Sequence, residues 1–323
     1  MAVFYQKYRP QTFAEVIGQE PIVQTLKNAA KSGTLAHAYL FTGSRGVGKT
    51  TVARLLAKAA NCQSLKEGDP CGTCNVCTSI ASGNTLDIIE IDAASHTGVD
   101  NVRELIENAS FRPTSMARKV FIIDEVHMLS KAAFNALLKT LEEPPEHVLF
   151  ILATTDIEKV PATIVSRTQR FDFKRIGASR MVDALTAIIA DQKLQFPDGV
   201  IDAIVSQSEG SMRDALTRLD MVAATAGNDL TLEEAGRLLG VTPLTSIQTL
   251  IDMVITRRSS DLPDFFENAF AGGQDPTAFN RGVLVYLRQL LHAKLTGNTP
   301  DIMSSDDTFA AQVKQIELPK LMY

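Results

Sequence analysis

The feature that most constrains this chain is an octapeptide, Gly43 to Thr50, that matches the pattern G-x-x-x-x-G-K-[ST]. The glycines of such a loop let backbone N–H groups turn inward around a triphosphate, and the lysine adds a positive charge for the outer phosphates. The threonine hydroxyl is placed to bind Mg²⁺. The sequence therefore predicts a phosphate-binding P-loop for a triphosphate, formed by Gly43, Ser44, Arg45, Gly46, Val47, Gly48, Lys49, Thr50 and Thr51.

The segments on either side of the octapeptide decide whether this match is meaningful. Residues 38–42 form a short apolar run typical of a strand, and residues 51–58 have the pattern of a helix. A helix that begins at the loop directs its N-terminal N–H groups toward the phosphates. The alternative, a glycine-rich loop that arose by chance, does not explain this order of strand, loop and helix.

A second strand carries two carboxylates that belong with the P-loop. Residues 119–125 form a nearly continuous apolar run, as expected for a buried parallel strand, and end in Asp124 and Glu125. Because ligands bind at the carboxyl ends of parallel strands, both side chains are expected beside the triphosphate. We predict that Asp124 holds Mg²⁺ through its water shell and that Glu125 orients and activates the attacking water. The alternative is an ordinary charged strand end.

The pattern up to residue 173 alternates between strands and helices, which favours an α/β fold with a parallel sheet covered on both faces. Thr154 and Thr155 follow one of the strands and would reach the same sheet edge as Asp124. The further strands are expected at residues 86–91, 147–153 and 169–173, and the helices at 99–109 and 131–143.

The residues before the P-loop strand include a helix that is expected to begin at Pro21 and to stop at Gly33. Because this segment precedes the P-loop, it can fold back over the base of the nucleotide. Its candidate nucleotide contacts are Tyr8, Arg9 and Val16.

All four cysteines lie within 16 residues, in the spacing C-x8-C-x2-C-x2-C. Four thiolates from a short, turn-rich segment suit a tetrahedral zinc ion with no open position, which makes the site structural. An iron–sulfur cluster is one alternative, although the C-x3-C-P continuation typical of ferredoxins is missing. Unliganded thiols are the other. We predict a zinc module at residues 62–77, with the ligands Cys62, Cys71, Cys74 and Cys77.

Composition limits the classes of protein that remain. The net charge is −5, from 32 basic and 37 acidic residues, which argues against a general attraction to nucleic acid or membranes. Residues 1–60 nevertheless hold eight basic and two acidic residues, a local charge of +6 that leaves −11 for the rest. Any contact with nucleic acid therefore has to use a local patch. No apolar run reaches the length of a membrane span, and we expect a cytoplasmic protein.

From residue 177 the strand patterns cease and helical patterns follow to residue 296. This change predicts three domains: a P-loop domain at 1–175, a small helical lid at 176–240 and a helical collar for oligomerisation at 241–323. The helices are expected near residues 178–193, 199–208, 211–226, 231–239, 244–257, 261–271 and 276–296.

The motifs taken together are more specific than a P-loop alone. The P-loop, the Asp124-Glu125 pair, residues 166–168 (Ser-Arg-Thr) and residues 211–216 (Ser-Met-Arg-Asp-Ala-Leu) occur in the order that resembles an AAA+ ATPase. Residues 7–10, residues 138–145 and the cysteine spacing narrow the resemblance. The chain is similar to the gamma/tau family of bacterial DNA polymerase III, the ATPases of the sliding-clamp loader.

This resemblance implies roles for three further residues. Thr155 would be the sensor of the γ-phosphate, and Arg213 would be a second sensor that reaches from the lid onto the phosphates. Arg167 would be an arginine finger that acts on the nucleotide of a neighbouring subunit, where a guanidinium stabilises the charge of the transition state. The alternatives are purely structural roles: an interface salt bridge for Arg167 and a helix-surface arginine for Arg213. Thr168 stands where the family usually has cysteine, which puts the packing behind the finger in question.

The resemblance also implies a function. ATP binding would favour a hetero-oligomeric ring that opens the sliding clamp and grips the phosphates of primer–template DNA, and hydrolysis would release it. We see no polymerase carboxylate site, and we expect no contacts of the kind that the polymerase- and helicase-binding domains of the long family members make. The alternatives are a branch-migration motor, a nucleotide-binding scaffold and a small-molecule kinase. We expect structural or solvent roles for the scattered histidines His37, His96, His127, His147 and His292.

Overall fold

Five parallel strands form one sheet in the order β2-β3-β4-β1-β5. The structure is a computed structural model, which describes residues 3–83, 85–95, 98–225, 230–240, 243–271, 275–297 and 307–316. His96 lies outside the described residues. The strands are β1 (Ala38–Thr42), β2 (Ile88–Asp92), β3 (Lys119–Asp124), β4 (Val148–Thr154) and β5 (Gln169–Asp172).

The strand order brings the predicted site residues to one edge. β4 lies between β1 and β3, with Thr42 opposite Thr154 and Ile123 opposite Leu152. The carboxyl end of β4 therefore stands between the P-loop, which follows β1, and the carboxylates, which follow β3. β1 and β4 are buried along their whole length, whereas the edge strands β2 and β5 are partly exposed. Strands buried on both faces read as continuous apolar runs, which is why the sequence pattern located them.

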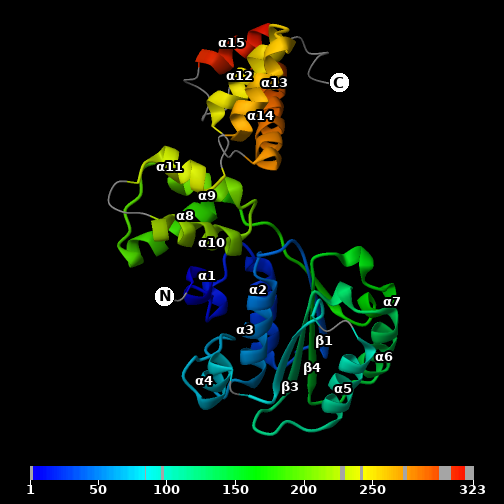
Figure 1. Ribbon diagram of the computed structural model, residues 1–323. Coiled ribbons are helices and arrows are strands. Elements are labelled where there is room, and N and C mark those ends of the chain that lie inside the picture. The colour runs from blue at the N-terminus through cyan, green and yellow to red at the C-terminus, as the bar shows by residue number, and fades with distance from the viewer. Residues whose placement is uncertain are drawn as a thin grey trace. The chain divides into compact units, whose positions relative to one another are not determined.

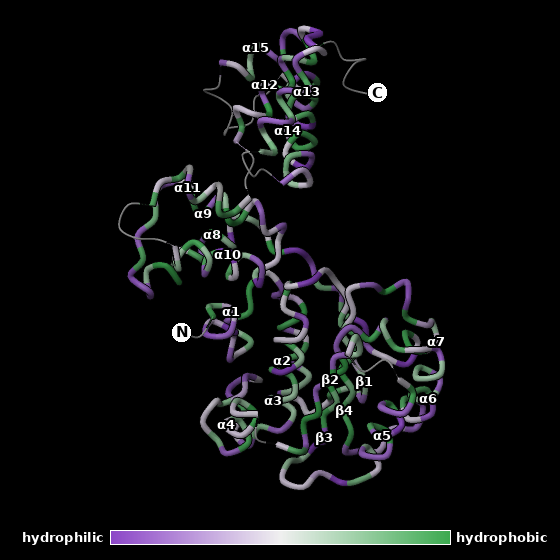
Figure 2. The backbone as a smooth tube through the Cα atoms, viewed as in Figure 1, coloured by the Kyte–Doolittle hydropathy of each residue, from purple (hydrophilic) through white to green (hydrophobic). Residues whose placement is uncertain are grey.

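Helices cover both faces of the sheet (Figure 1). On one face, α2 (Glu20–Ser32) and α3 (Lys49–Asn61) pack their apolar sides on the sheet, for example Leu26 and Leu56 with Tyr39. On the other face, α5 (Val99–Ser110) and α6 (Lys131–Glu142) do the same, with Leu137 beside the stacked rings of Phe121 and Phe150. The apolar residues concentrate in the strands and the inner helix faces (Figure 2). The predicted parallel sheet, covered on both faces, is confirmed.

The described residues fall into two compact units: 1–192 with 208–217, and 193–207 with 218–323. The predicted domain boundaries near 175 and 240 stay predictions. The first unit also contains α1 (Phe4–Lys7), η1 (Phe13–Glu15), α4 (Asn75–Ser82), η2 (Val126–Met128), η3 (Ile157–Lys159), α7 (Ala162–Val165), α8 (Ala178–Gln192) and the start of α10 (Met212–Thr225).

The second unit is helical in its described part. Tyr286 and Leu290 of one of its helices pack with Ile247, Ile251 and Phe309 in a separate core. The hydroxyl of Tyr286 donates a hydrogen bond to Gln312 at 2.6 Å. No helix in the described part of the chain combines the length and apolar character needed to cross a bilayer. The helices are α9 (Val200–Gln207), α11 (Leu232–Leu238), α12 (Leu244–Ile255), η4 (Ser259–Asp261), α13 (Leu262–Ala271), α14 (Pro276–Thr296) and α15 (Asp307–Gln315).

The expected elements match the structure apart from their ends. The strand expected at 86–91 begins two residues later, at Ile88, and Asp87 just before it accepts hydrogen bonds at its carboxylate from the backbone N–H groups of Thr114, Ser115 and Met116. The helix expected at 244–257 ends at Ile255. Among the described α-helices, four lack a counterpart in the sequence-based prediction: α1, α4, which begins within the cysteine segment, α7 and α15.

Candidate functional site

The P-loop folds tightly between β1 and α3. Its glycines Gly43, Gly46 and Gly48 have φ angles of 141°, 75° and 104°, which L side chains rarely adopt. A Cβ atom on Gly43 would lie 2.4 Å from the carbonyl oxygen of Phe173, so the loop passes too close to the end of β5 for any other residue.

Lys49 folds back on the loop that precedes it. Its Nζ donates hydrogen bonds to the carbonyl oxygens of Gly43 at 2.7 Å and Ser44 at 2.9 Å. Burial lowers the pKa of Lys49, whereas the nearby charges of Glu125 and Asp124 act to raise it. The ammonium is thus held at the mouth of the loop by weak acceptors that phosphate oxygens can replace.

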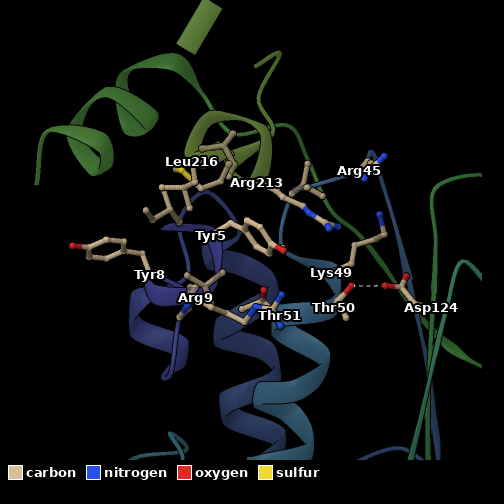
Figure 3. A pocket seen from close by; sticks show the side chains of 18 of the residues that line it. Tyr5, Tyr8, Arg9, Arg45, Lys49, Thr50, Thr51, Asp124, Arg213 and Leu216 are labelled. Carbon is tan, nitrogen blue, oxygen red and sulfur yellow. Dashed lines mark hydrogen bonds between the residues drawn. The ribbon is translucent and has the colours of Figure 1, made fainter. Parts of the chain in front are cut away.

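The predicted Mg²⁺ ligands are in direct contact. The hydroxyl of Thr50, in the first turn of α3, donates to Oδ2 of Asp124 at 2.7 Å (Figure 3). The backbone N–H of Glu125 donates to the other oxygen of Asp124 at 2.9 Å. A hydroxyl and a carboxylate are oxygen donors of the kind that Mg²⁺ prefers, so the pair fits this ion.

Glu125 follows β3 in a left-handed conformation with φ 47°. Its Oε2 accepts hydrogen bonds from the hydroxyl of Thr155 at 2.8 Å and from the backbone N–H of Thr155 at 3.2 Å. Nδ1 of His127 lies 3.4 Å from the same oxygen and 3.0 Å from the hydroxyl of Thr154. The structure therefore brings together the expected water-activating carboxylate and the expected phosphate sensor, along with a histidine that the sequence left without a role.

The start of α10 packs directly on the P-loop. The backbone N–H of Met212 donates to the carbonyl of Gly46 at 3.1 Å, and a Cβ on Gly46 would lie 1.9 Å from Oγ of Ser211. Arg213 stands next in the helix, with its guanidinium carbon 5.3 Å from the centre of the Tyr5 ring (Figure 3). This cation–π contact holds the guanidinium of Arg213 in the part of the site that Lys49 also lines.

These elements enclose a pocket of about 550 Å³. Among the predicted nucleotide contacts, Tyr8, Arg9, Val16 and residues 45–51 line it, whereas Gly43 and Ser44 do not. Asp124, Glu125 and Arg213 also line it, which places catalytic candidates and phosphate loop around one cavity. The sequence-based prediction did not name much of the wall as nucleotide contacts. Pro10, Met212 and Leu216 belong to motifs that it used only for the resemblance, and no motif marks the others: Tyr5, Glu15, Ile17, Glu90, Ile91, Asp92, Ala94, Ile176, Ala184 and Ile188.

Tyr8 lines the pocket but is bound to α8. Its hydroxyl donates to Oδ2 of Asp191 at 2.5 Å and accepts a hydrogen bond from Gln192. Burial, followed by the bond to Asp191, raises the pKa of Tyr8. In the close-up the hydroxyl points away from Lys49 (Figure 3). Tyr8 thus ties the N-terminal segment to α8 and offers its ring to the pocket.

Arg167 lies away from this pocket, at the end of α7. Its guanidinium forms an ion pair with Glu142 and donates to the carbonyl oxygen of Thr163 at 2.8 Å. Arg167 is not among the residues that line the P-loop pocket. The neighbouring Thr168 donates its hydroxyl to the carbonyl of Ile164 at 3.1 Å. Threonine at this position therefore makes a hydrogen bond within its own helical turn.

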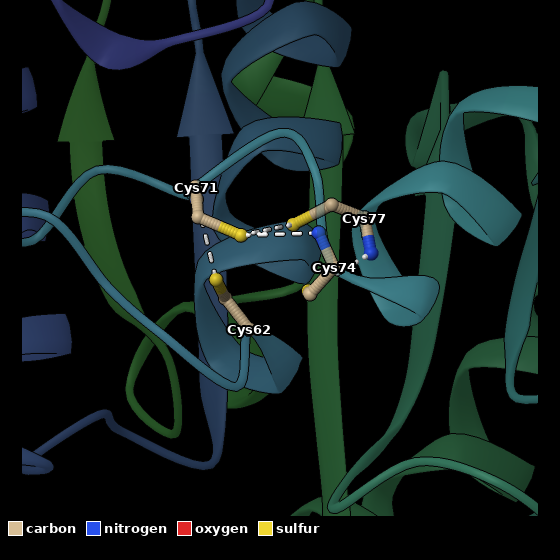
Figure 4. Close-up of side chains that lie close together, drawn as sticks. All are labelled: Cys62, Cys71, Cys74 and Cys77. Carbon is tan, nitrogen blue, oxygen red and sulfur yellow. Dashed lines mark hydrogen bonds between the residues drawn. The ribbon is translucent and has the colours of Figure 1, made fainter.

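The four cysteines come together in one cluster (Figure 4). Their sulfur atoms all lie within 4.8 Å of one another. Sulfurs about 2.3 Å from a central zinc stand about 3.8 Å apart in a tetrahedron, so this cluster fits the ion. Backbone N–H groups point at sulfur, from Cys71 to Cys62 at 3.2 Å and from Cys74 to Cys71 at 3.3 Å.

The environments of these thiols differ. Backbone N–H donors, that of Cys74 first, lower the pKa of Cys71 to about 6. Burial raises the pKa of Cys77 to about 12. A bound dication would favour the thiolate at the buried position as well, because a coordinated thiol is deprotonated.

The fold and the site together define a P-loop protein with a parallel α/β sheet. Solved structures share this fold: the RuvB Holliday junction branch migration motor of Thermotoga maritima matches with a TM-score of 0.52 and 18% identity, over 77% of this chain and 79% of that one. A structure of a point mutant of the same protein gives a TM-score of 0.51 over 84% of this chain and 90% of that one, at 17% identity. At such low identity the likeness shows the fold alone.

Comparison with the sequences of known proteins identifies the family of this chain. A family model described as DNA polymerase III, delta subunit, matches residues 18–177. The DNA polymerase III subunit tau of Bacillus subtilis is 42% identical over 97% of this chain and 56% of its own length, and that of Escherichia coli is 38% identical over 98% and 49%. The subunit gamma of Buchnera aphidicola is 41% identical over 80% of this chain and 71% of its own length. The chain belongs to the DNA polymerase III gamma/tau family, and it spans about half the length of these tau subunits.

Proposed function

We propose that this chain binds and hydrolyses ATP as the motor subunit of a sliding-clamp loader. The observation that carries this proposal is the single pocket that Lys49, Asp124, Glu125 and Arg213 line together. A cavity of about 550 Å³ is within the range of sites for ligands of nucleotide size. Its apolar wall would take the base, and the loop 43–50 would take the phosphates.

Each polar residue would have a separate task in the reaction. Lys49 would leave the carbonyl oxygens of its own loop and bind the outer phosphates, joined by Arg213 from α10. Glu125 would orient the attacking water and accept its proton while the water oxygen bonds to the γ-phosphorus and ADP departs. Thr155, which bonds to Glu125, would sense the γ-phosphate from the end of β4.

Thr50 and Asp124 would hold Mg²⁺, Asp124 through the water shell of the ion. The ion would neutralise charge on the phosphates when bound. The direct bond between the two side chains supports this assignment, because it shows that both oxygens can reach the same place.

Arg167 would complete the site of a neighbouring subunit. It is absent from the lining of the pocket in its own chain, and its side chain is 33% exposed, so it can exchange Glu142 for an external anion. An arginine supplied in trans stabilises the charge of the transition state and contributes roughly 10³–10⁵-fold in rate in other phosphoryl-transfer enzymes. Hydrolysis would then depend on assembly.

The family membership supports the wider role. Other clamp-loader subunits would form a hetero-oligomeric ring with this chain, through a collar at 241–323, and residues 176–240 would act as the lid. The ring would open the sliding clamp and grip the backbone of primer–template DNA without sequence preference. The protein would be a cytoplasmic component of the DNA-directed DNA polymerase III holoenzyme. The holoenzyme is a transferase, but this chain would not itself join nucleotides.

The module at 62–77 would hold structural zinc through Cys62, Cys71, Cys74 and Cys77.

The proposal is tested by the steady-state ATPase rate of a reconstituted loader, with and without sliding clamp and primed DNA. The expected result is stimulation by clamp and primed DNA together and loss of that stimulation in Lys49→Ala. A wild-type ATPase rate that does not change when sliding clamp and primed DNA are added would contradict the clamp-loader function. Retention of ATP binding in that case would leave a P-loop ATPase with another partner.

A further inference from the structure

Asp69 joins the cysteine module to the N-terminal segment. It lies between Cys62 and Cys71 in the chain, and its carboxylate points at two groups outside the module. Oδ1 accepts the backbone N–H of Phe13 at 2.7 Å, and Oδ2 forms an ion pair with Lys27 at 2.6 Å. The side chains of Lys27 and Asp69 are only 20% and 15% exposed, so water competes weakly for these contacts.

The cysteine module holds Asp69 in a fixed place. Two backbone hydrogen bonds of 2.9 Å join Lys66 and Asp69 and close a tight turn. Gly68 within this turn has φ 92°, and a Cβ there would lie 2.5 Å from the carbonyl oxygen of Lys27. The module therefore presses against α2 at backbone contact distance. Its end is held by the N–H of Cys71, which donates to the sulfur of Cys62.

On the other side of the bond, Phe13 lies two residues before a segment that lines the nucleotide pocket. Phe13 is 1% exposed and opens η1, and the N–H of Val16 donates to its carbonyl at 3.2 Å. The next residues, Glu15, Val16 and Ile17, line the pocket. The position of Phe13 thus fixes the position of this wall.

We propose that Asp69 is a positioning residue. Through it the cysteine module holds one wall of the nucleotide pocket, formed by residues 15–17, in place. The inference rests on the proposed function, because it assumes that the pocket binds ATP. Without the carboxylate, the buried N–H of Phe13 loses its acceptor, which is costly, and the wall at 15–17 loosens. Metal at the four cysteines would then strengthen nucleotide binding through Asp69, although no cysteine lines the pocket.

Three variants separate the hydrogen bond to Phe13 from the ion pair. Asp69→Ala removes both contacts, whereas Asp69→Asn and Lys27→Met break the ion pair and keep an acceptor for Phe13. The dissociation constant of a fluorescent ATP analogue is measured for each, together with zinc content. Asp69→Ala is expected to raise the constant about 5–10-fold with its zinc retained, and the other two to stay within about twofold of wild type.

The binding of the ATP analogue by the wild type distinguishes a failure of this inference from a failure of the proposed function. If the wild type binds no analogue, the nucleotide site and this inference are both wrong. If the wild type binds and Asp69→Ala binds equally well, or if Asp69→Asn is as weak as Asp69→Ala, the inference alone is overturned.

A second measurement needs no variant and covers the case in which Asp69→Ala does not fold. Hydrogen exchange of residues 11–17 is followed in the wild-type protein before and after removal of metal by a chelator. Removal is expected to speed exchange in this segment by about tenfold or more while the strands β1 and β4 remain protected. Unchanged exchange at 11–17 after complete loss of metal would overturn the inference.

Discussion

The hydroxyl of Thr155 donates to Oε2 of Glu125 across 2.8 Å, and the backbone N–H of Thr155 reaches the same oxygen across 3.2 Å. The contact exists because β4 lies between the P-loop strand and the strand that ends in Asp124. The residue proposed to sense phosphate therefore also holds the residue proposed to activate water. A γ-phosphate that attracts the Thr155 hydroxyl would free Glu125 to turn to the water.

Replacement of Thr155 tests this arrangement. Thr155→Val removes the hydroxyl at nearly constant volume and is expected to lower kcat about tenfold or more, with little change in the KM for ATP, because the contact serves the reaction step. Thr155→Ser keeps the hydroxyl and should retain activity within a few-fold. Steady-state kinetics of the reconstituted complex separate the two. Equal losses in both variants would show that the hydroxyl is not the group that matters.

Gly46 is expected to be essential for the closure of α10 on the P-loop. Gly46→Ala places a Cβ against Ser211 and Arg213 at a φ of 75°, and should weaken ATP binding more than about tenfold. Gly33→Ala is the matched control, because Gly33 has φ 70° and no atom within 4 Å of a Cβ. It carries the same backbone strain, about 1–2 kcal/mol, without the clash. Equal ATP affinity in the two variants would count against this packing role.

The cysteine cluster is expected to contain one zinc ion per chain. Cys71→Ser should lose the metal and lower the melting temperature of the protein, because a structural zinc contributes directly to folding. Thr73→Ala is the control, since its hydroxyl only approaches the sulfur of Cys71, at 3.8 Å, and it should keep its zinc. Elemental analysis of the purified proteins decides the question. Unchanged metal content in Cys71→Ser would refute the site.

Asp87 gives the stability of the α/β unit a dependence on pH. It is 1% exposed; burial acts to raise its pKa, but the N–H groups of Thr114, Ser115 and Met116 and the Ser115 hydroxyl outweigh this and lower it. A carboxyl whose pKa is lowered on folding adds stability above its unfolded pKa, about 3.9, and loses it as the pH falls through the lower folded value.

Asp87→Asn is therefore expected to cost about 1–3 kcal/mol in the free energy of unfolding at pH 7. The difference from wild type should begin to shrink below about pH 4, where the carboxyl of the unfolded wild-type chain takes up a proton, and should shrink further as the pH falls through the lower folded pKa. Urea unfolding at pH 7 and pH 3 measures both values. A difference that stays constant across this range would exclude the carboxylate charge as the cause.

The sequence predicted those features that depend on local order along the chain. The P-loop is one continuous segment, β3 and β4 are continuous apolar runs, and the cysteines have a spacing that a short loop can close. The pocket wall was not predictable in this way, because Tyr5, Ile176 and Leu216 meet only after the chain has folded. Nor could spacing reveal that Thr155 holds Glu125, since that contact depends on the strand order in the sheet.

The most direct test of a site shared between subunits mixes two inactive variants. Lys49→Ala removes ATP binding at a chain's own pocket, and Arg167→Ala removes the finger that the chain would lend to its neighbour. In loaders built with the two variants at defined neighbouring positions, we predict that the ATPase rate depends on their order. The rate is expected to survive where an intact Arg167 faces an intact Lys49, and to be lost where either is missing. Losses that simply add, whatever the order of the subunits, would contradict the shared site.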